Sequence, residues 1–125
     1  MKVLIIDDEV ELVRLTEKWI RSKGYEVYSY FEGKGAIDHI REVCPDAILL
    51  DLLLPDISGI EIFYTLKADP ELSKIPVLFF TSYNVKEWPE LTNLWPEGII
   101  NKPYDPKYLL SELERVLANP EESKP

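Results

Sequence analysis

Four short runs of consecutive apolar residues constrain the fold of this 125-residue chain more than any other feature. Three of them fill residues 3–6, 47–50 and 77–80, and the fourth is the shorter pair Ile99-Ile100 within 98–101. None of them alternates clearly with polar residues. Uninterrupted apolar runs of this length are typical of strands that are buried on both faces, as in a parallel sheet covered by helices. The sequence therefore predicts an α/β protein with helices on both sides of its sheet.

The segments between these runs carry the expected helical patterns. Apolar residues recur at helical spacing after the first run, and Gly24 is a plausible stop for that helix. Ser58 and Glu61 match a capping box, and Asp105-Pro106 places an N-cap acid before a proline. Residues 26–30 alternate as a shorter strand. Five helices are expected, over residues 10–20, 36–43, 58–67, 89–95 (short or irregular, because Pro89 and Pro96 bound it) and 106–118.

The four buried strands each end in polar residues. Asp7-Asp8 follow the first, Asp51 the third, Thr81-Ser82 the fourth and Lys102-Pro103 the fifth. In an open parallel sheet, functional groups gather outside the carboxyl ends of the strands. The strand order 2-1-3-4-5 groups these four ends, so we predict a flavodoxin-like doubly wound sandwich of five parallel strands with one shared pocket.

Such a pocket favours metal-assisted phosphoryl chemistry. Three carboxylates converging at about 5 Å repel pairwise by roughly 3 kcal/mol at an effective dielectric near 20, so they need a cation. Ligands that are all oxygen favour Mg²⁺. A carboxylate such as Asp51 can also act as a nucleophile that forms an aspartyl phosphate.

These residues, followed by the run Leu54-Pro55-Asp56-Ile57-Ser58-Gly59, resemble the receiver domain of two-component response regulators, of the chemotaxis-receiver type, over nearly the whole chain. The resemblance implies a signalling phosphoacceptor that assists its own phosphorylation and dephosphorylation rather than an ordinary enzyme. It implies a phosphohistidine donor on a histidine kinase or phosphotransfer protein, and a downstream protein target. It also implies a cis peptide bond before Pro103. The implied roles are phosphoacceptor for Asp51, phosphoryl contacts for Thr81 and Lys102, and Mg²⁺ ligation by Asp8, Asp51 and the Leu53 carbonyl, with Asp7 acting through water.

One position departs from that family pattern. Receivers commonly carry an aromatic residue three positions before the lysine, and this chain has Ile99 there. A degenerate receiver that binds partners without phosphorylation is therefore the alternative. A flavodoxin-like cofactor binder fits less well because its first loop would carry glycines and hydroxyls instead of acids. An aspartate-nucleophile phosphatase would place its acids in an Asp-x-Asp pattern on the first strand.

Composition limits the partners and the location of the protein. The formal net charge of −9 argues against direct binding to nucleic acid. No apolar run approaches the roughly 18 residues of a membrane span, and no signal peptide precedes the first strand, so we expect a cytoplasmic protein. The single cysteine, Cys44, excludes an internal disulfide, and we expect it to be half-buried. We expect a receiver domain over residues 1–119 and a flexible tail over 120–125, in a protein that either stands alone or was excised from a longer chain.

Overall fold

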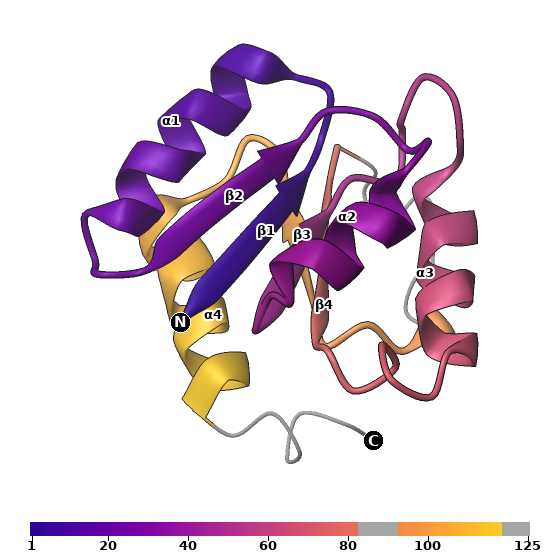
Figure 1. The fold of residues 1–125 in the computed structure, drawn as a ribbon. Helices are drawn as coiled ribbons and strands as arrows, with labels where there is room; N and C mark the ends of the chain where they lie inside the picture. The colour runs from indigo at the N-terminus through magenta and orange to yellow at the C-terminus, as the bar shows by residue number, and fades with distance from the viewer. Residues whose placement is uncertain (83–92, 119–125) are drawn as a thin grey trace.

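Five parallel strands form one sheet in the order β2-β1-β3-β4-β5, as the sequence predicts (Figure 1). The computed structural model describes residues 1–82 and 93–118. The strands are β1 (Lys2–Ile6), β2 (Glu26–Tyr30), β3 (Ala47–Leu50), β4 (Val77–Thr81) and β5 (Gly98–Asn101). The chain leaves β1 toward β2 on one side and later returns to β3 on the other side, so the strand order reverses beside β1.

Within residues 1–82 and 93–118, two helices cover each face of the sheet. Figure 1 shows α1 (Val10–Arg21) and α4 (Pro106–Ala118) on one side, and α2 (Ala36–Val43) and α3 (Gly59–Ala68) on the other. Four of the expected helices are thus present within a few residues of their predicted bounds. The expected short helix falls mainly on residues 83–92, outside the part of the chain that the structure describes. No helix in the described ranges is both long and apolar enough to cross a membrane.

The apolar runs of β1, β3 and β4 are buried because both faces of the sheet are covered, whereas the edge strand β5, which we expected to be buried as well, buries only Ile100. Side chains alternate between the faces along each strand. Val3 and Ile5 pack with α1 and α4, whereas Leu4 and Ile6 pack with α2 and α3. The same alternation divides β3 and β4 between the two cores. Every residue of β3 and β4 is buried, which explains why their sequences show no polar alternation.

The spacing of apolar residues predicts that Ile60, Phe63, Tyr64 and Leu66 of α3 are available for burial, and the structure differs from this in part. Phe63 and Leu66 are buried as predicted, but Tyr64 is 57% exposed and Ile62 is buried instead. The helix begins at Gly59, which packs so closely on the preceding loop that an added Cβ would lie 2.1 Å from the Asp51 carbonyl oxygen. This contact sets the helix rotation, so the residues three, four and seven positions after Gly59 face the core.

An arginine of α1 occupies part of the free edge of β2. Arg21 Nη2 donates to the outward-facing carbonyl oxygen of Val27 at 2.8 Å, and Arg21 Nη1 lies 3.7 Å from the buried Glu17 carboxylate. Glu17 also accepts hydrogen bonds from Arg14 and Ser29. Burial raises the pKa of Glu17, but these hydrogen bonds and the two arginines outweigh it and leave the pKa below its usual value. The carboxylate is therefore held in its charged form.

Candidate functional site

Backbone hydrogen bonds place the polar strand ends at one edge of the sheet. Asp7 follows β1 and donates its amide to the Tyr30 carbonyl of β2 at 3.1 Å. Asp51 follows β3 and donates to the Ile6 carbonyl of β1 at 2.9 Å. The two aspartates therefore stand side by side where the strand order reverses. This is the position at which open α/β sheets bind their ligands.

Lys102 reaches this edge from β5 and contacts three carboxylates. Its Nζ lies 2.6 Å from Asp7 Oδ2, 3.2 Å from Asp51 Oδ2 and 3.4 Å from Glu9 Oε1. Its side chain is only 6% exposed, and Nζ lies 5.1 Å from the centre of the Phe80 ring. The ammonium group thus sits at the centre of the acidic site with an aromatic face beside it.

Three carboxylates form a compact cluster of oxygen ligands. Asp7, Asp8 and Asp51 each offer one oxygen, and these oxygens lie within 4.8 Å of one another. Asp7 and Asp51 are buried, whereas Asp8 is exposed. Three carboxylates and one ammonium group leave a formal charge of −2, so the cluster attracts cations.

One oxygen of Asp7 is left without a hydrogen bond. Asp7 Oδ1 accepts from the Glu9 amide at 2.9 Å. Oδ2 is the only buried side-chain oxygen or nitrogen among the described residues that forms no hydrogen bond, and its short contact with Lys102 is a charge contact without hydrogen-bond geometry. A buried oxygen of this kind is a natural partner for a metal-bound water.

Burial dominates the electrostatics of the two central acids. It raises the pKa of Asp7 to about 6, although Lys102 and the Glu9 amide act in the opposite direction. Burial also raises the pKa of Asp51 against the Leu53 amide and Lys102. For Lys102, burial would lower the pKa, but the contacts with Asp7 and Asp51 outweigh it and raise the pKa. The site therefore holds charged groups whose negative charge is only partly compensated.

The loop after β3 is folded tightly around Asp51. The Leu53 amide donates to Asp51 Oδ1 at 3.0 Å, which fixes the carboxylate. The Gly59 amide donates to the Leu52 carbonyl at 3.1 Å, and a Cβ on Gly59 would lie 2.7 Å from Leu52 Cα. Only glycine fits there. The Leu53 side chain is 47% exposed beside the acidic cluster.

Thr81, at the end of β4, and Pro103, directly after Lys102, are the remaining strand-end residues that the sequence singled out. Thr81 ends β4 and is fully buried, and its carbonyl accepts the Lys102 amide at 2.9 Å. In the register of β3 and β4, Leu50 pairs with Phe79, so Phe80 is level with Asp51. Thr81 lies one residue beyond that level. The Lys102-Pro103 peptide bond is cis, as the sequence predicts.

An apolar groove lies next to the Lys102-Pro103 turn. It has a volume of about 280 Å³. Leu15, on its rim, is 62% exposed. Two hydrogen bonds tie its walls together, from Trp19 Nε1 to the Pro106 carbonyl at 3.0 Å and between the hydroxyls of Thr16 and Tyr104 at 2.9 Å. The groove is lined by Leu12, Leu15, Trp19, Pro103, Tyr104 and Pro106.

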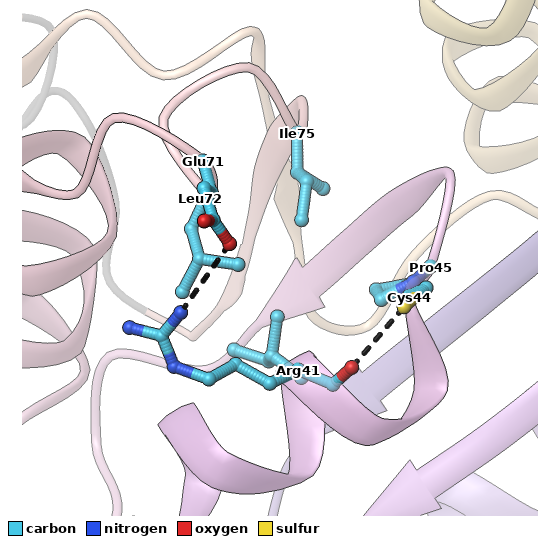
Figure 2. Close-up of a pocket in the computed structure, with 7 residues that line it drawn as sticks. Arg41, Cys44, Pro45, Glu71, Leu72 and Ile75 are labelled. Carbon is cyan, nitrogen blue, oxygen red and sulfur yellow. Dashed lines mark hydrogen bonds and ion pairs between the residues drawn. The ribbon is translucent and has the colours of Figure 1, made fainter.

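A second cavity, of about 310 Å³, lies near the amino ends of β3 and β4 and is distant from the acidic cluster (Figure 2). Arg41 spans it and forms ion pairs with Asp69 and Glu71, so its charge is already compensated. Cys44 lies at its rim and is exposed, so our expectation of a half-buried cysteine is wrong. The reason is local: Cys44 ends α2 in the left-handed conformation at φ 52°, and the adjacent Pro45 is the residue that is buried.

Sequence reasoning missed two acidic residues near the site. Glu9 contacts Lys102, and its place directly after Asp7-Asp8 was the available signal. Asp56 accepts three backbone hydrogen bonds, from Gly33, Lys34 and Ile57. Nothing in the local sequence around Asp56 indicated that it would contact a loop more than 20 residues earlier in the chain.

Comparison with known proteins assigns the family. A model of the response regulator receiver domain matches residues 3–114. The polar-differentiation response regulator DivK of Brucella ovis is 39% identical over 84 residues, which cover 67% of this chain and 68% of that protein. The probable transcriptional regulator ycf29 of Pyropia yezoensis is 28% identical over 118 residues, which cover 94% of this chain but only 53% of ycf29. The chain therefore belongs to the response regulator receiver domain family.

Solved structures agree with this assignment. A putative response regulator from Chloroflexus aurantiacus superposes with a TM-score of 0.87 at 27% identity, covering 94% of this chain and 98% of that one. The chemotaxis response regulator CheY4 of Vibrio cholerae superposes with a TM-score of 0.83 at 26% identity, covering 93% and 98%. Receiver domains are the signalling modules of two-component systems, and they bind Mg²⁺ at an acidic pocket. The cluster of Asp7, Asp8 and Asp51 fits such an ion because all its ligands are oxygens and Asp7 Oδ2 accepts no hydrogen bond.

Proposed function

We propose that this chain is the phosphoacceptor switch of a two-component phosphorelay, with Asp51 as the acceptor. The observation that carries the proposal is the position of Asp51. The residue is 2% exposed, and its carboxylate lies within the acidic cluster and contacts Lys102 at 3.2 Å. A buried carboxylate beside both a cation-binding cluster and a lysine is suited to accept a negatively charged group.

The reaction joins an oxygen of Asp51 to the phosphorus of a partner phosphohistidine. As the new oxygen–phosphorus bond forms, the phosphorus–nitrogen bond breaks and its electron pair returns to the imidazole nitrogen. Phosphoryl transfer depends mainly on positioning and charge neutralisation. Lys102 supplies positive charge to a phosphoryl oxygen, and the Thr81 hydroxyl donates a hydrogen bond to another.

Residues of the acidic cluster hold Mg²⁺ in this proposal. Asp8, Asp51 and the Leu53 carbonyl are the direct ligands, and Asp7 acts through a water. When bound, the ion neutralises carboxylate and phosphoryl charge so that the two negative groups can approach. The proximity of the three carboxylates and the hydrogen bond that fixes Asp51 beside Leu53 support this ligand set.

The apolar groove beside the Lys102-Pro103 turn is the proposed docking surface for the phosphodonor. A donor protein must bring its histidine to Asp51, so its contact surface must begin at the rim of the acidic site. The groove adjoins that rim through Pro103 and exposes Leu15 on α1. Grooves of this kind accept apolar side chains from a partner helix. A Leu15→Glu variant is expected to slow transfer from the partner but leave phosphorylation by a small phosphodonor unchanged.

Intact-mass measurement tests the assignment of Asp51. The protein is incubated with Mg²⁺ and acetyl phosphate, and we expect one phosphoryl adduct on the wild type and none on Asp51→Asn. Asp38→Asn, an exposed acid on α2, is the matched control and keeps the adduct. A wild type without an adduct, or an adduct that persists in Asp51→Asn, would refute the assignment. The first result would favour a phosphorylation-independent binding module, consistent with the aliphatic Ile99.

We also propose that the receiver unit extends to residue 119, with residues 120–125 as a tail. The family match to residue 114 and the continuation of α4 to Ala118 support this boundary. A chain truncated after residue 119 is expected to keep both its thermal stability and its phosphorylation by acetyl phosphate. A large loss of either would contradict the boundary.

A further inference from the structure

Asp56 joins two loops that come from different strands. It lies in the loop after β3, and its Oδ1 accepts from the Gly33 amide at 2.8 Å and from the Ile57 amide at 2.9 Å. Its Oδ2 accepts from the Lys34 amide at 2.8 Å. Gly33 and Lys34 belong to the loop after β2. One carboxylate therefore clamps two consecutive amides of a neighbouring loop, with both of its oxygens in use.

These contacts are strong enough to position a loop. Hydrogen bonds to an ionised carboxylate are shorter and roughly twice as strong as those between neutral groups. The amides of Gly33 and Lys34 and the Ile57 amide hold the pKa of Asp56 below its usual value, so the carboxylate is charged near neutral pH. Although Asp56 is exposed, its three partners are fixed backbone groups rather than flexible side chains.

Close packing of Gly33 against Ile57 also holds the two loops together. Gly33 is buried, and an added Cβ would lie 2.8 Å from Ile57 Cβ and 3.1 Å from Asp56 Oδ1. The two loops are thus in direct contact, with no room for a larger residue. The loop after β2 is itself anchored, because the Tyr30 hydroxyl donates to the Lys34 carbonyl at 2.6 Å. The clamp therefore connects the loop after β3 to a fixed support.

The loop that is held in this way carries the ligands of the proposed site. It begins at Asp51, whose Oδ1 accepts from the Leu53 amide, and it ends at Gly59, whose amide donates to the Leu52 carbonyl. We propose that Asp56 is a positioning residue for Mg²⁺: by clamping this loop against the loop after β2, it holds the Leu53 carbonyl beside the acidic cluster. The inference rests on the proposed function, because Leu53 is a ligand only in that proposal.

Mg²⁺ affinity of the purified chain, measured by calorimetric titration without any phosphodonor, tests the clamp. Loss of an outer-shell partner typically weakens metal binding by 10–100-fold. We expect Asp56→Ala to weaken binding by about 10-fold at the low end of that range, and Asp56→Asn, which keeps one acceptor oxygen, to weaken it less. Gly33→Ala, which forces the loops apart while every acid of the chain is kept, is expected to weaken binding as well. Asp38→Ala removes an exposed charge from α2 and should stay within about twofold of the wild type.

Amide hydrogen exchange supplies a second readout that is independent of metal. In Asp56→Ala, the amides of Gly33 and Lys34 should exchange faster, and so should the amide of Leu53. Faster exchange at Gly33 and Lys34 with unchanged Mg²⁺ affinity would overturn the proposal, as would an equal loss of affinity in Asp38→Ala. If the wild type binds Mg²⁺ but takes up no phosphoryl group, the proposed function is refuted. The Mg²⁺ affinities of Asp56→Ala and Asp38→Ala still decide whether Asp56 positions the ligand loop.

Discussion

Replacement of Asp7 with Asn should raise the free energy of unfolding when divalent cations are absent. Asn has nearly the shape of a protonated Asp but cannot carry its charge. The pKa of Asp7 rises from 3.8 to about 6 because the carboxyl group is buried, so keeping it charged in the folded state is unfavourable. A difference of about two units at 1.36 kcal/mol per unit gives about 3 kcal/mol at pH 8. This is an upper limit because a neutral amide in place of the Asp7 carboxylate would no longer compensate the charge of Lys102.

The sign of the pH dependence follows from that difference. The folded protein binds the Asp7 proton more tightly than the unfolded chain does, so protonation favours folding. The contribution of Asp7 to stability is fully present below pH 3.8, declines as the pH rises toward about 6 and is lost above it. The advantage of Asp7→Asn over the wild type should therefore be absent near pH 3.5 and complete by about pH 7.

Urea denaturation in EDTA, repeated from pH 3.5 to pH 8, measures this difference. Asp8→Asn is the matched control, since Asp8 belongs to the same cluster but is exposed, and its replacement should change stability by less than about 1 kcal/mol. Equal stabilities of Asp7→Asn and the wild type at pH 8 would refute the reasoning. So would an advantage of the variant that grew as the pH fell.

Three further substitutions, one of them paired with a control variant, test other parts of the site. Lys102→Met leaves two buried carboxylates without their cation and should lower the free energy of unfolding by about 3–5 kcal/mol in urea denaturation at pH 8. The loss should be smaller at pH 5, where Asp7 is protonated, and an equal loss at both pH values would contradict this. Gly59→Ala forces a Cβ against backbone and should lower the free energy of unfolding by about 3 kcal/mol or more. The control Gly24→Ala has open space around the new Cβ but a φ of +95°, so it should lose only about 1–2 kcal/mol. Similar melting temperatures for the two variants would argue against the close contact at Gly59. Leu53→Asn replaces an exposed apolar side chain beside Asp51 and should shorten the lifetime of the phosphorylated state by admitting water, and an unchanged decay of the adduct in intact-mass measurements would reject that role.

The strands could be predicted because each buried run carries its own signal. The apolar segments of β3 and β4 are buried on both faces, so their burial depends little on which neighbour lies where. The buried stripe of α3 was only partly predictable. Its rotation depends on the contact of Gly59 with the Asp51 carbonyl, which is a tertiary contact that hydrophobic spacing along the helix does not reveal.

The convergence of the site was predictable from topology, but its internal contacts were not. Parallel strands that end in polar residues deliver those residues to one edge, which brings Asp7, Asp51 and Lys102 together. Which of the three carboxylates lies closest to Lys102 depends on small differences in side-chain geometry, which the sequence does not reveal. The Asp56 clamp depends on the path of the loop after β2, and the sequence of that loop shows no acceptor or donor that singles out Asp56.

The Arg21 contact on Val27 has a consequence for how this molecule can assemble. A foreign strand that paired with the whole length of β2 would have to take over the Val27 carbonyl, and it would displace the guanidinium group that already occupies it. Displacement would also remove a cation from the neighbourhood of buried Glu17. Growth of the sheet across this edge is therefore opposed twice, by the loss of the Arg21 hydrogen bond and by the loss of a cation near Glu17.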